Sequence, residues 1–172
     1  MHHLKTLYWL SVRVWIITLA ILGMLTMGLS CYLLGPLYSK MLFNDYRFWR
    51  HHRQFFPATM HLWKLAFKMI AEPKYRKMTA LMSASDWLDG PRRGPIPGTA
   101  TVREDWPHAA DTCGSCNRCC TVVKCPLHEA DTGFCKSYAS PFWDFFPCGR
   151  YPATQAQVDY YECPKWDVIA KD

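Results

Sequence analysis

The sequence has 172 residues and a formal net charge of +6 at pH 7. Its length leaves room for about one domain and a tether. Eight of its nine cysteines lie between Cys113 and Cys163. A segment this small seldom buries enough apolar surface to fold on that alone, and it usually needs metals or disulfides. An ordinary hydrophobic-core domain is therefore excluded for this segment.

The charge is segregated along the chain. Lys and Arg are concentrated in residues 40–93, whereas acidic residues outnumber basic ones in residues 101–172. The basic excess thus follows an apolar stretch and does not lie in the cysteine segment. Attraction to anionic lipids explains a basic stretch in that position. We therefore expect no nucleic-acid binding.

Residues 14–34 contain no charged side chain and are mostly apolar. About 20 such residues are needed to cross the hydrocarbon core of a bilayer as a helix. The sequence therefore predicts one transmembrane helix within an anchor of residues 1–40. We expect Arg13 to extend toward the headgroups, and Gly35-Pro36 to end the helix.

The alternative for this stretch is a cleaved signal peptide, with Cys31 in a lipobox-like site. Signal h-regions usually run for about 7–15 residues, and this apolar run is longer. More bases follow the span than precede it, which favours a cytoplasmic C-terminal side. These bases are Lys5 and Arg13 before it, and Lys40, Arg47, Arg50 and Arg53 after it. We expect a single-pass protein of a bacterial-type inner membrane, with the N-terminus outside.

Residues 41–88 form a basic and aromatic juxtamembrane segment. Within it, the spacing predicts an amphipathic helix over residues 57–72, with Pro57 in the first turn and Pro73 ending it. A wide apolar face beside a narrow basic stripe suits contact with the membrane interface or a partner subunit. The alternative is that this helix covers the cysteine domain.

Residues 89–107 are rich in Pro and Gly and are predicted to be a linker. Residues 108–172 form the predicted cysteine-rich domain, small and irregular, with little regular secondary structure and organised by metal. The predicted fold class is thus a membrane-anchored chain with one transmembrane helix, an interfacial helix and this domain.

The spacing of the first cysteines points to an iron–sulfur centre. Cys113, Cys116 and Cys119 follow the C-x2-C-x2-C pattern of bacterial ferredoxins, in which a Cys-Pro supplies a further ligand. Both Cys125-Pro126 and Cys163-Pro164 offer one. We predict a [4Fe–4S] cluster and leave open which cysteines share a metal. The candidate ligands are Cys113, Cys116, Cys119, Cys120, Cys125, Cys135, Cys148 and Cys163.

Zinc is the main alternative metal, because four-cysteine zinc sites also use C-x2-C pairs. Such sites ordinarily contain a second pair about 15–20 residues away, which this chain lacks. His108 and His128 could substitute as ligands, although surface positions explain them more simply. Four disulfides are the third possibility. The adjacent Cys119-Cys120 and the expected cytoplasmic location argue against them.

The order of these motifs resembles the YkgJ-type cysteine-cluster proteins, which are described as zinc- or iron-chelating. The resemblance covers residues 113–164. Asn117, the short spacing from Cys120 to Cys125 and the segment 140–143 depart from the family pattern. The resemblance implies chelation and no particular reaction. The motifs that carry it are CxxCxxCC from Cys113, Cys125-Pro126-Leu127, Gly133-Phe134-Cys135 and Cys148-Gly149-Arg150-Tyr151-Pro152.

Aromatic residues among the later cysteines are expected to form an apolar shell around the centre, which would exclude water and tune its reduction potential. They are Phe142, Trp143, Phe145, Phe146, Tyr151, Tyr160, Tyr161 and Trp166. The sequence contains no recognisable catalytic set, and crowded cysteines are better explained as ligands than as a nucleophile.

The function that these features favour is an accessory subunit of a membrane redox complex. It would carry an iron–sulfur cluster at the cytoplasmic face, with the lipid bilayer and other subunits of the complex as partners. An electron-transfer or non-catalytic subunit fits better than an independent enzyme. The alternatives are a membrane-tethered structural zinc module for interaction or assembly, and an extracytoplasmic domain held by disulfides.

Overall fold

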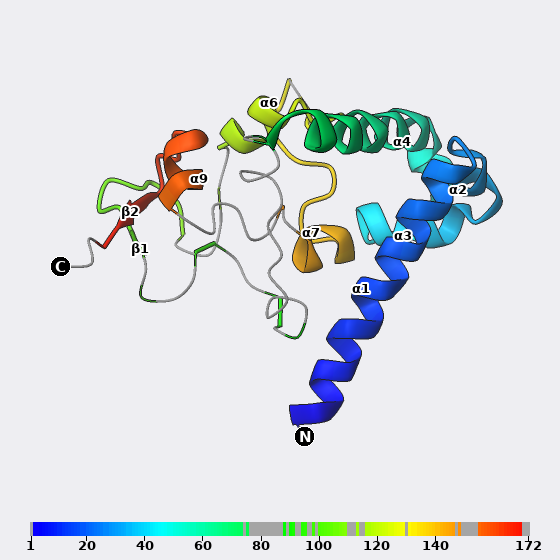
Figure 1. The fold of residues 1–172 in the computed structure, drawn as a ribbon, viewed down its shortest axis with the longest axis horizontal. Coiled ribbons are helices and arrows are strands. Elements are labelled where there is room, and N and C mark those ends of the chain that lie inside the picture. The colour runs from blue at the N-terminus through cyan, green and yellow to red at the C-terminus, as the bar shows by residue number, and fades with distance from the viewer. Residues whose placement is uncertain are drawn as a thin grey trace.

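The computed structural model describes residues 2–73, 75, 88, 90, 91, 94, 95, 98, 100–109, 113, 116–129, 131–146, 148 and 155–169. Regular structure within them is mostly helical, with little strand (Figure 1). The N-terminal helices are α1 (His2–Leu25), α2 (Leu29–Leu33), α3 (Gly35–Phe43) and α4 (Phe48–Ala71). They are followed by β1 (Ala100–Val102), α6 (Arg118–Val123), α7 (Pro141–Phe145), α9 (Gln155–Tyr160) and β2 (Trp166–Val168).

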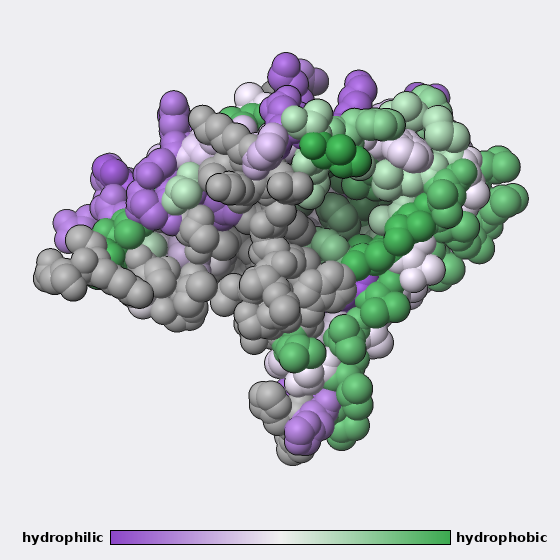
Figure 2. Space-filling model, in the orientation of Figure 1, coloured by the Kyte–Doolittle hydropathy of each residue, from purple (hydrophilic) through white to green (hydrophobic). Residues whose placement is uncertain are grey.

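Helix α1 contains a stretch, His3–Leu25, that is long and apolar enough to cross a membrane. This rests on length and composition, and a signal sequence would meet the same criterion. Only 22% of its most apolar window is buried inside the structure, so most of its apolar surface is left uncovered by this chain. Figure 2 shows hydrophobic residues gathered along α1 and around the turn that follows it.

The bounds predicted for the apolar helix, residues 14–34, are wrong. The helix ends at Leu25, and the chain turns through Met27 and Gly28, whose φ angles are +50° and +90°. The hydroxyl of Thr26 donates to Leu22 O at 2.7 Å, which helps to close this end. Gly35 and Pro36 begin α3 instead of ending a helix, because a proline in the first turn needs no N–H.

The turn folds α3 back against α1. The Tyr38 hydroxyl donates to Leu19 O at 2.6 Å, and Tyr38 is 2% exposed. Ile16 and Leu19 from α1 join Leu42 from α3 in one buried cluster. Burial of such side chains stabilises the hairpin by about 1.5–3 kcal/mol each.

Helix α4 crosses this hairpin and packs on α1, α2 and α3. It begins at Phe48, so the helix predicted over residues 57–72 starts too late, and Pro57 lies inside it. Phe55 is 1% exposed in the core, and Trp63 Nε1 donates to Met24 O at 3.2 Å. The tryptophan thus adds a second hydrogen bond to the Met24 carbonyl at the end of α1, which also accepts from Met27 N at 3.1 Å.

The C-terminal part of the chain joins the same core. Leu127 and Phe145 are buried in the cluster that α1, α3 and α4 form. Arg13, expected at the headgroups, is instead fully buried, with its guanidinium carbon 5.4 Å from the centre of the Phe145 ring. Aromatic contact replaces the predicted extension toward lipid, because α7 packs against α1.

One two-stranded antiparallel sheet lies at the other end of this part. Strand β1 pairs with β2, with Ala100 opposite Val168 and Val102 opposite Trp166. Residues 100–102 belong to the segment predicted as a linker, so the end of that segment takes part in the cysteine-rich fold. Of the other residues of the predicted linker, 90, 91, 94, 95, 98 and 103–107 are also described, and Gly94 and Pro95 among them are buried.

Candidate metal centre

Seven of the eight clustered cysteines line one cavity of about 270 Å³. They come from separate segments of the chain and are Cys113, Cys116, Cys119, Cys120, Cys135, Cys148 and Cys163. Cys125 is not among the lining residues and packs beside the helical core. The ninth cysteine, Cys31, is buried in that core, with its Sγ 3.7 Å from Thr59 Oγ1. All nine are free thiols in the structure.

Helix α6 presents two neighbouring cysteines, Cys119 and Cys120, from its first half. It ends at Lys124, which adopts the left-handed conformation with φ +56°. This cap directs the chain back, so the Cys125 N–H donates to Cys120 O at 3.0 Å. A left-handed residue other than glycine costs about 1–2 kcal/mol, so the surrounding structure must hold it.

The position of Cys163 is also set by a left-handed residue after a short helix. Helix α9 is followed by Glu162 in the left-handed conformation, with φ +48°. The Cys163 N–H then donates to Val158 O at 2.9 Å. In both cases a short helix, a left-handed residue and a Cys-Pro follow one another, although the sequences share little beyond Cys-Pro. The proline removes an N–H donor next to the sulfur and sets the chain direction.

Burial raises the pKa of Cys125 and of Cys163, and backbone N–H groups in the turns that follow these two cysteines and Cys135 act in the opposite direction. The donors are Leu127 and His128 for Cys125, Ser137 and Tyr138 for Cys135, and Lys165 and Trp166 for Cys163. Backbone N–H groups aimed at a sulfur favour its thiolate form, which is the form that binds metal. These turns therefore offset part of the effect of burial on the three cysteines.

A hairpin holds Cys125 and Cys135 near one another. Lys136 N donates to Leu127 O at 2.9 Å, and His128 forms a bridge with Cys135. The Cys120 thiol also hydrogen-bonds the Cys135 sulfur, which lowers the pKa of Cys135 to about 7 even though burial opposes this. Cys120 and Cys135 thus meet in the cavity wall, and the hairpin places Cys125 behind them.

On the other side, the segment around Cys113 approaches Cys163. Cys116 N donates to Cys113 O at 2.9 Å, forming a turn. Arg118, directly before Cys119, pairs with Glu162, directly before Cys163, with 2.7 Å between Nη1 and Oε2. Exposed ion pairs contribute little stability. This pair nevertheless shows that the start of α6 lies beside the turn before Cys163.

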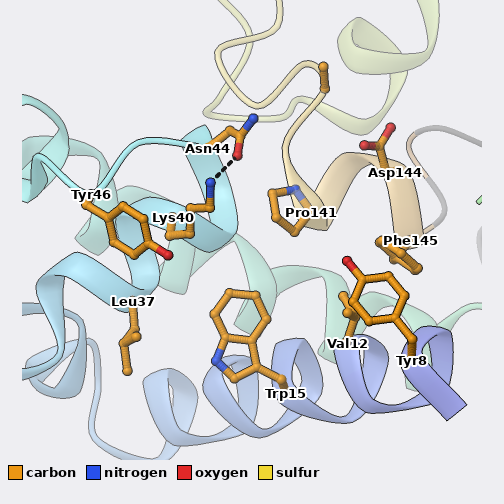
Figure 3. A pocket seen from close by; sticks show the side chains of 11 residues that line it. Tyr8, Val12, Trp15, Leu37, Lys40, Asn44, Tyr46, Pro141, Asp144 and Phe145 are labelled. Atoms are coloured by element: carbon orange, nitrogen blue, oxygen red, sulfur yellow. Dashed lines mark hydrogen bonds between the residues drawn. The ribbon is translucent and has the colours of Figure 1, made fainter.

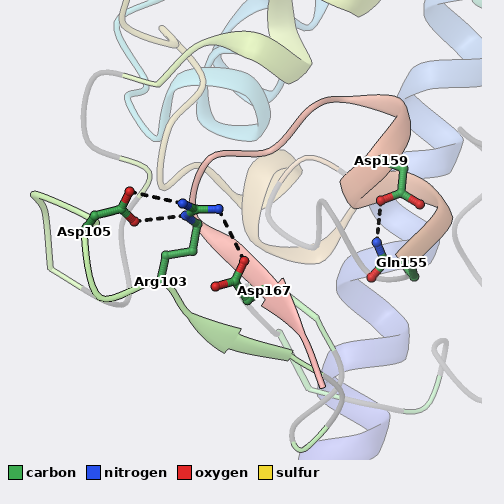
Figure 4. A network of polar contacts seen from close by, with 5 residues as sticks. All are labelled: Arg103, Asp105, Gln155, Asp159 and Asp167. Carbon is green, nitrogen blue, oxygen red and sulfur yellow. Dashed lines mark hydrogen bonds and ion pairs between the residues drawn. The ribbon is translucent and has the colours of Figure 1, made fainter. Parts of the chain in front are cut away.

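Strand β2 follows the Cys163 turn in the chain, and Arg103 next to β1 makes polar contacts with it (Figure 4). Arg103 forms two hydrogen bonds with Asp105, at 2.9 and 3.1 Å, and contacts Asp167 on β2 at 3.4 Å. Its backbone N–H donates to Lys165 O at 2.9 Å. Strand pairing therefore fixes the residues that follow Cys163.

The thiols are difficult to ionise together in the protein alone. Burial raises the pKa of Cys119, and the sulfurs of Cys163, Cys113 and Cys116 raise it further. Its hydrogen bond with Cys135 raises the pKa of Cys120, with burial and the sulfurs of Cys135, Cys148 and Cys125 adding to the effect. A bound cation reverses this, because a coordinating thiol is deprotonated outright.

Cys148 is also surrounded by sulfur. Burial raises its pKa, and Cys125, Cys135 and Cys119 follow as causes. Its residue is accessible to solvent because it faces the cavity, while protein atoms surround it densely on the other sides. A sulfur in the wall of a cavity can be exposed to that cavity and still be poorly hydrated, which accounts for the raised pKa.

The cavity wall also carries groups that the sequence did not reveal. Lys165 is 4% exposed and lines the cavity, with its Nζ 4.7 Å from the centre of the Trp166 ring. Trp106, also in the wall, has a buried Nε1 without a hydrogen-bond partner among the described residues. An ammonium group and an unused N–H donor at a sulfur-lined cavity both fit an anionic metal–thiolate group.

The aromatic shell differs from the one expected. Trp143 lines the cavity together with Phe134 and Tyr138, whereas Phe142, Phe145 and Phe146 pack toward the helical core. Tyr161 is buried at 1% exposure. Tyr151 lies outside the described residues. Part of the predicted shell thus joins the two regions of the chain instead.

The two histidines considered as ligands lie in different surroundings. His108 is exposed and meets Trp106 edge-on, with 5.1 Å between ring centres. His128 is half-buried in the hairpin beside Cys135, and its Nε2 has no partner within the part of the chain that the structure describes. His128 is the better placed of the two.

Among the described residues, no group of three His, Cys, Asp or Glu side chains is arranged to hold a single metal ion. The cysteines surround a cavity and do not converge on a point. A second cavity, of about 360 Å³, lies between α1, α3 and α7 (Figure 3). Tyr8, Trp15 and Phe145 contribute to its wall, and Lys40 there donates to Asn44 at 2.7 Å. None of the residues that line this cavity is a cysteine.

No protein-family model matches the chain, and comparisons with curated proteins and with solved structures find no match either. The resemblance to the YkgJ-type proteins therefore stays an interpretation of the motif order.

Proposed function

We propose that this chain is a metal–thiolate protein whose cysteine-lined cavity holds an iron–sulfur cluster for electron transfer. The observation that carries the proposal is the gathering of seven cysteines, from separate segments, around one cavity. Free thiols in such numbers are better explained as ligands than as unrelated buried side chains.

The shape of the cavity favours a cluster over a single ion. Zn–S bonds of about 2.3 Å in a tetrahedral site bring the sulfurs to about 3.8 Å from one another. The described side chains form no such single-ion site, whereas a cavity of about 270 Å³ leaves room for iron and inorganic sulfide between the thiolates. When bound, the cluster would supply one-electron exchange.

The chain's own residues would bind and tune this cluster. Backbone N–H groups stabilise the thiolates of Cys125, Cys135 and Cys163. Lys165 offsets negative charge at the cavity wall, and Trp143 excludes water.

We place this centre in a membrane redox complex as an accessory subunit. Support comes from α1, which is long and apolar enough to span, and from apolar side chains exposed near its end. Leu25, Leu29 and Leu33 are each more than 60% exposed there. Such a surface is stable in contact with lipid or with other subunits.

The test is metal and acid-labile sulfide analysis, with EPR, on the full chain purified without oxygen in detergent. We expect iron and sulfide in comparable amounts and an EPR signal after reduction. Cys31→Ala serves as the control variant, because this cysteine lies in the helical core, and it should retain both. Protein without iron and sulfide contradicts the proposal.

A structural zinc site is the second candidate. The observation in its favour is the interaction between the thiols of Cys120 and Cys135, which both line the cavity. Two sulfurs that interact in this way could serve one ion without rearrangement. The same preparation would then contain zinc and no sulfide, show no redox signal, and lose stability on chelation.

A further inference from the structure

We infer that the eight cysteines form two four-thiolate centres, and that the neighbours Cys119 and Cys120 belong to different ones. The first centre takes Cys113, Cys116, Cys119 and Cys163, and the second takes Cys120, Cys125, Cys135 and Cys148. This inference rests on the proposed function, since it assumes that the cysteines bind metal.

The second centre is assembled by contacts among its own members. Cys125 N donates to Cys120 O at 3.0 Å, and Cys120 hydrogen-bonds Cys135 through its thiol. The hairpin that begins after Cys125 returns at Cys135, where His128 forms its bridge. Cys148 lines the same cavity as Cys120 and Cys135, and the sulfurs of Cys125 and Cys135 act on its pKa more strongly than the sulfur of Cys119 does.

The first centre is assembled by a different set of contacts. The Cys113 turn brings Cys116 N to 2.9 Å from Cys113 O. The ion pair between Arg118 and Glu162 aligns the start of α6 with the Cys163 turn. Besides burial, the sulfurs of Cys163, Cys113 and Cys116 raise the pKa of Cys119. Cys163 is the Cys-Pro ligand of this centre, and Cys125 is that of the second.

Helix geometry explains why two adjacent cysteines separate. Successive residues of α6 point about 100° apart around the helix axis. The Cys119 and Cys120 side chains therefore leave the helix in different directions and meet different sulfurs. Because a four-cysteine metal site or cluster takes four thiolates, eight cysteines in two sets of four leave none over.

The experiment compares the full-length protein with Cys119→Ser and Cys120→Ser, purified anaerobically. Metal per chain is measured by elemental analysis, and thiols left accessible are mapped by alkylation and mass spectrometry. Each single variant should lose about half of the metal. Cys120→Ser should expose Cys125, Cys135 and Cys148 to alkylation while the first set stays protected, and Cys119→Ser should do the reverse.

Double variants test membership directly. Cys119→Ser with Cys163→Ser should lose no more metal than Cys119→Ser alone, whereas Cys119→Ser with Cys125→Ser should lose all of it. Complete loss of metal in either single variant, or exposure of all cysteines in both, overturns the two-centre assignment. A mixed alkylation pattern that crosses the two sets also overturns it.

The wild-type protein separates the two proposals. One centre per chain leaves the proposed function standing and overturns the inference. Two centres per chain, lost one at a time, support both. No metal at all contradicts the proposed function itself and removes the basis of the inference. Cys148→Ser provides a second variant of the second set in case Cys120→Ser misfolds, and it should expose Cys120, Cys125 and Cys135.

Discussion

The helical region and the cysteine region of this chain are held together by different forces. In the first, α1, α3 and α4 bury large side chains such as Ile16, Tyr38 and Phe55 to 2% exposure or less. In the second, α6 has six residues and buries none of them. Helices of this length are unstable by themselves in water. The comparison teaches that a shared apolar core holds the first region, whereas α6 depends on contacts with the rest of the chain and, in the proposed function, on bonds from its thiols.

The magnitudes support this contrast. Binding of structural zinc to small cysteine sites is worth about 10–16 kcal/mol, and most of that is folding free energy. Burial of one large apolar side chain is worth about 1.5–3 kcal/mol. The cysteine region would therefore depend on metal for most of its order, while the helical region would not.

The largest expected effect is that of metal removal. We expect a chelator to remove the protection of α6 and of the hairpin from Cys125 to Cys135. Helices α1, α3 and α4 should stay protected, because large apolar side chains form their core and Cys125 alone among the candidate ligands packs against it. Hydrogen exchange with mass spectrometry measures both regions in one sample. Loss of protection in α3 and α4 at the same chelator concentration would show that the comparison is false.

The helical region should respond to a change in its core. Phe55→Ala should lower the free energy of unfolding of this region by about 3–5 kcal/mol, since it leaves a cavity among buried rings. Phe56→Ala is the matched control, because Phe56 is 52% exposed and Phe55 only 1%. Denaturant unfolding followed by circular dichroism measures both. Equal effects of the two changes would argue against the α4 packing, and metal content should stay unchanged in each.

Within the cysteine region, Lys165→Met should lower the reduction potential of the centre, by an amount on the order of tens of millivolts. A buried ammonium favours the more negative, reduced state, and the substitution removes it. Lys136→Met is the control, because Lys136 is exposed and pairs with Glu129 at 3.6 Å. The measurement is a potentiometric titration followed by EPR. An unchanged potential would place the Lys165 amino group away from the centre.

The smallest expected effect concerns the sheet that supports Cys163. Hydrogen bonds from Arg103 lower the pKa of Asp105 below its ordinary 3.8. A lowered pKa in the folded state means that the stabilisation is present above the unfolded value and is lost as pH falls through the folded one. Asp105→Asn should therefore remove a small stabilisation at neutral pH and none at strongly acidic pH. NMR titration of the carboxyl measures the shift, and Glu104→Gln provides the control.

The sequence predicted an apolar N-terminal helix because composition alone determines that property. It placed the helix end wrongly because the turn depends on Thr26 and Gly28, whose effects are local and compete with a continuous apolar pattern. The start of α4 was missed for a related reason, since a proline within a helix resembles a helix start.

The candidate ligands could be chosen from cysteine spacing, while their surroundings could not. Trp106 and Lys165 reach the cavity through strand pairing and the Cys163 turn, which are contacts between residues far apart in sequence. The left-handed residues Lys124 and Glu162 were equally hidden, because neither residue type signals that conformation. Phe145 was expected beside the metal, but α7 carries it toward α1.

The absence of any buried side chain in α6 has a consequence for how metal is taken up. In the two-centre assignment, this short helix presents one ligand to each centre, so its ordering is required by both. The first metal to bind would bear the entropic cost of fixing α6, and the second would bind to a helix already formed. Uptake would then be positively cooperative, and by linkage each centre would strengthen the other to the same degree.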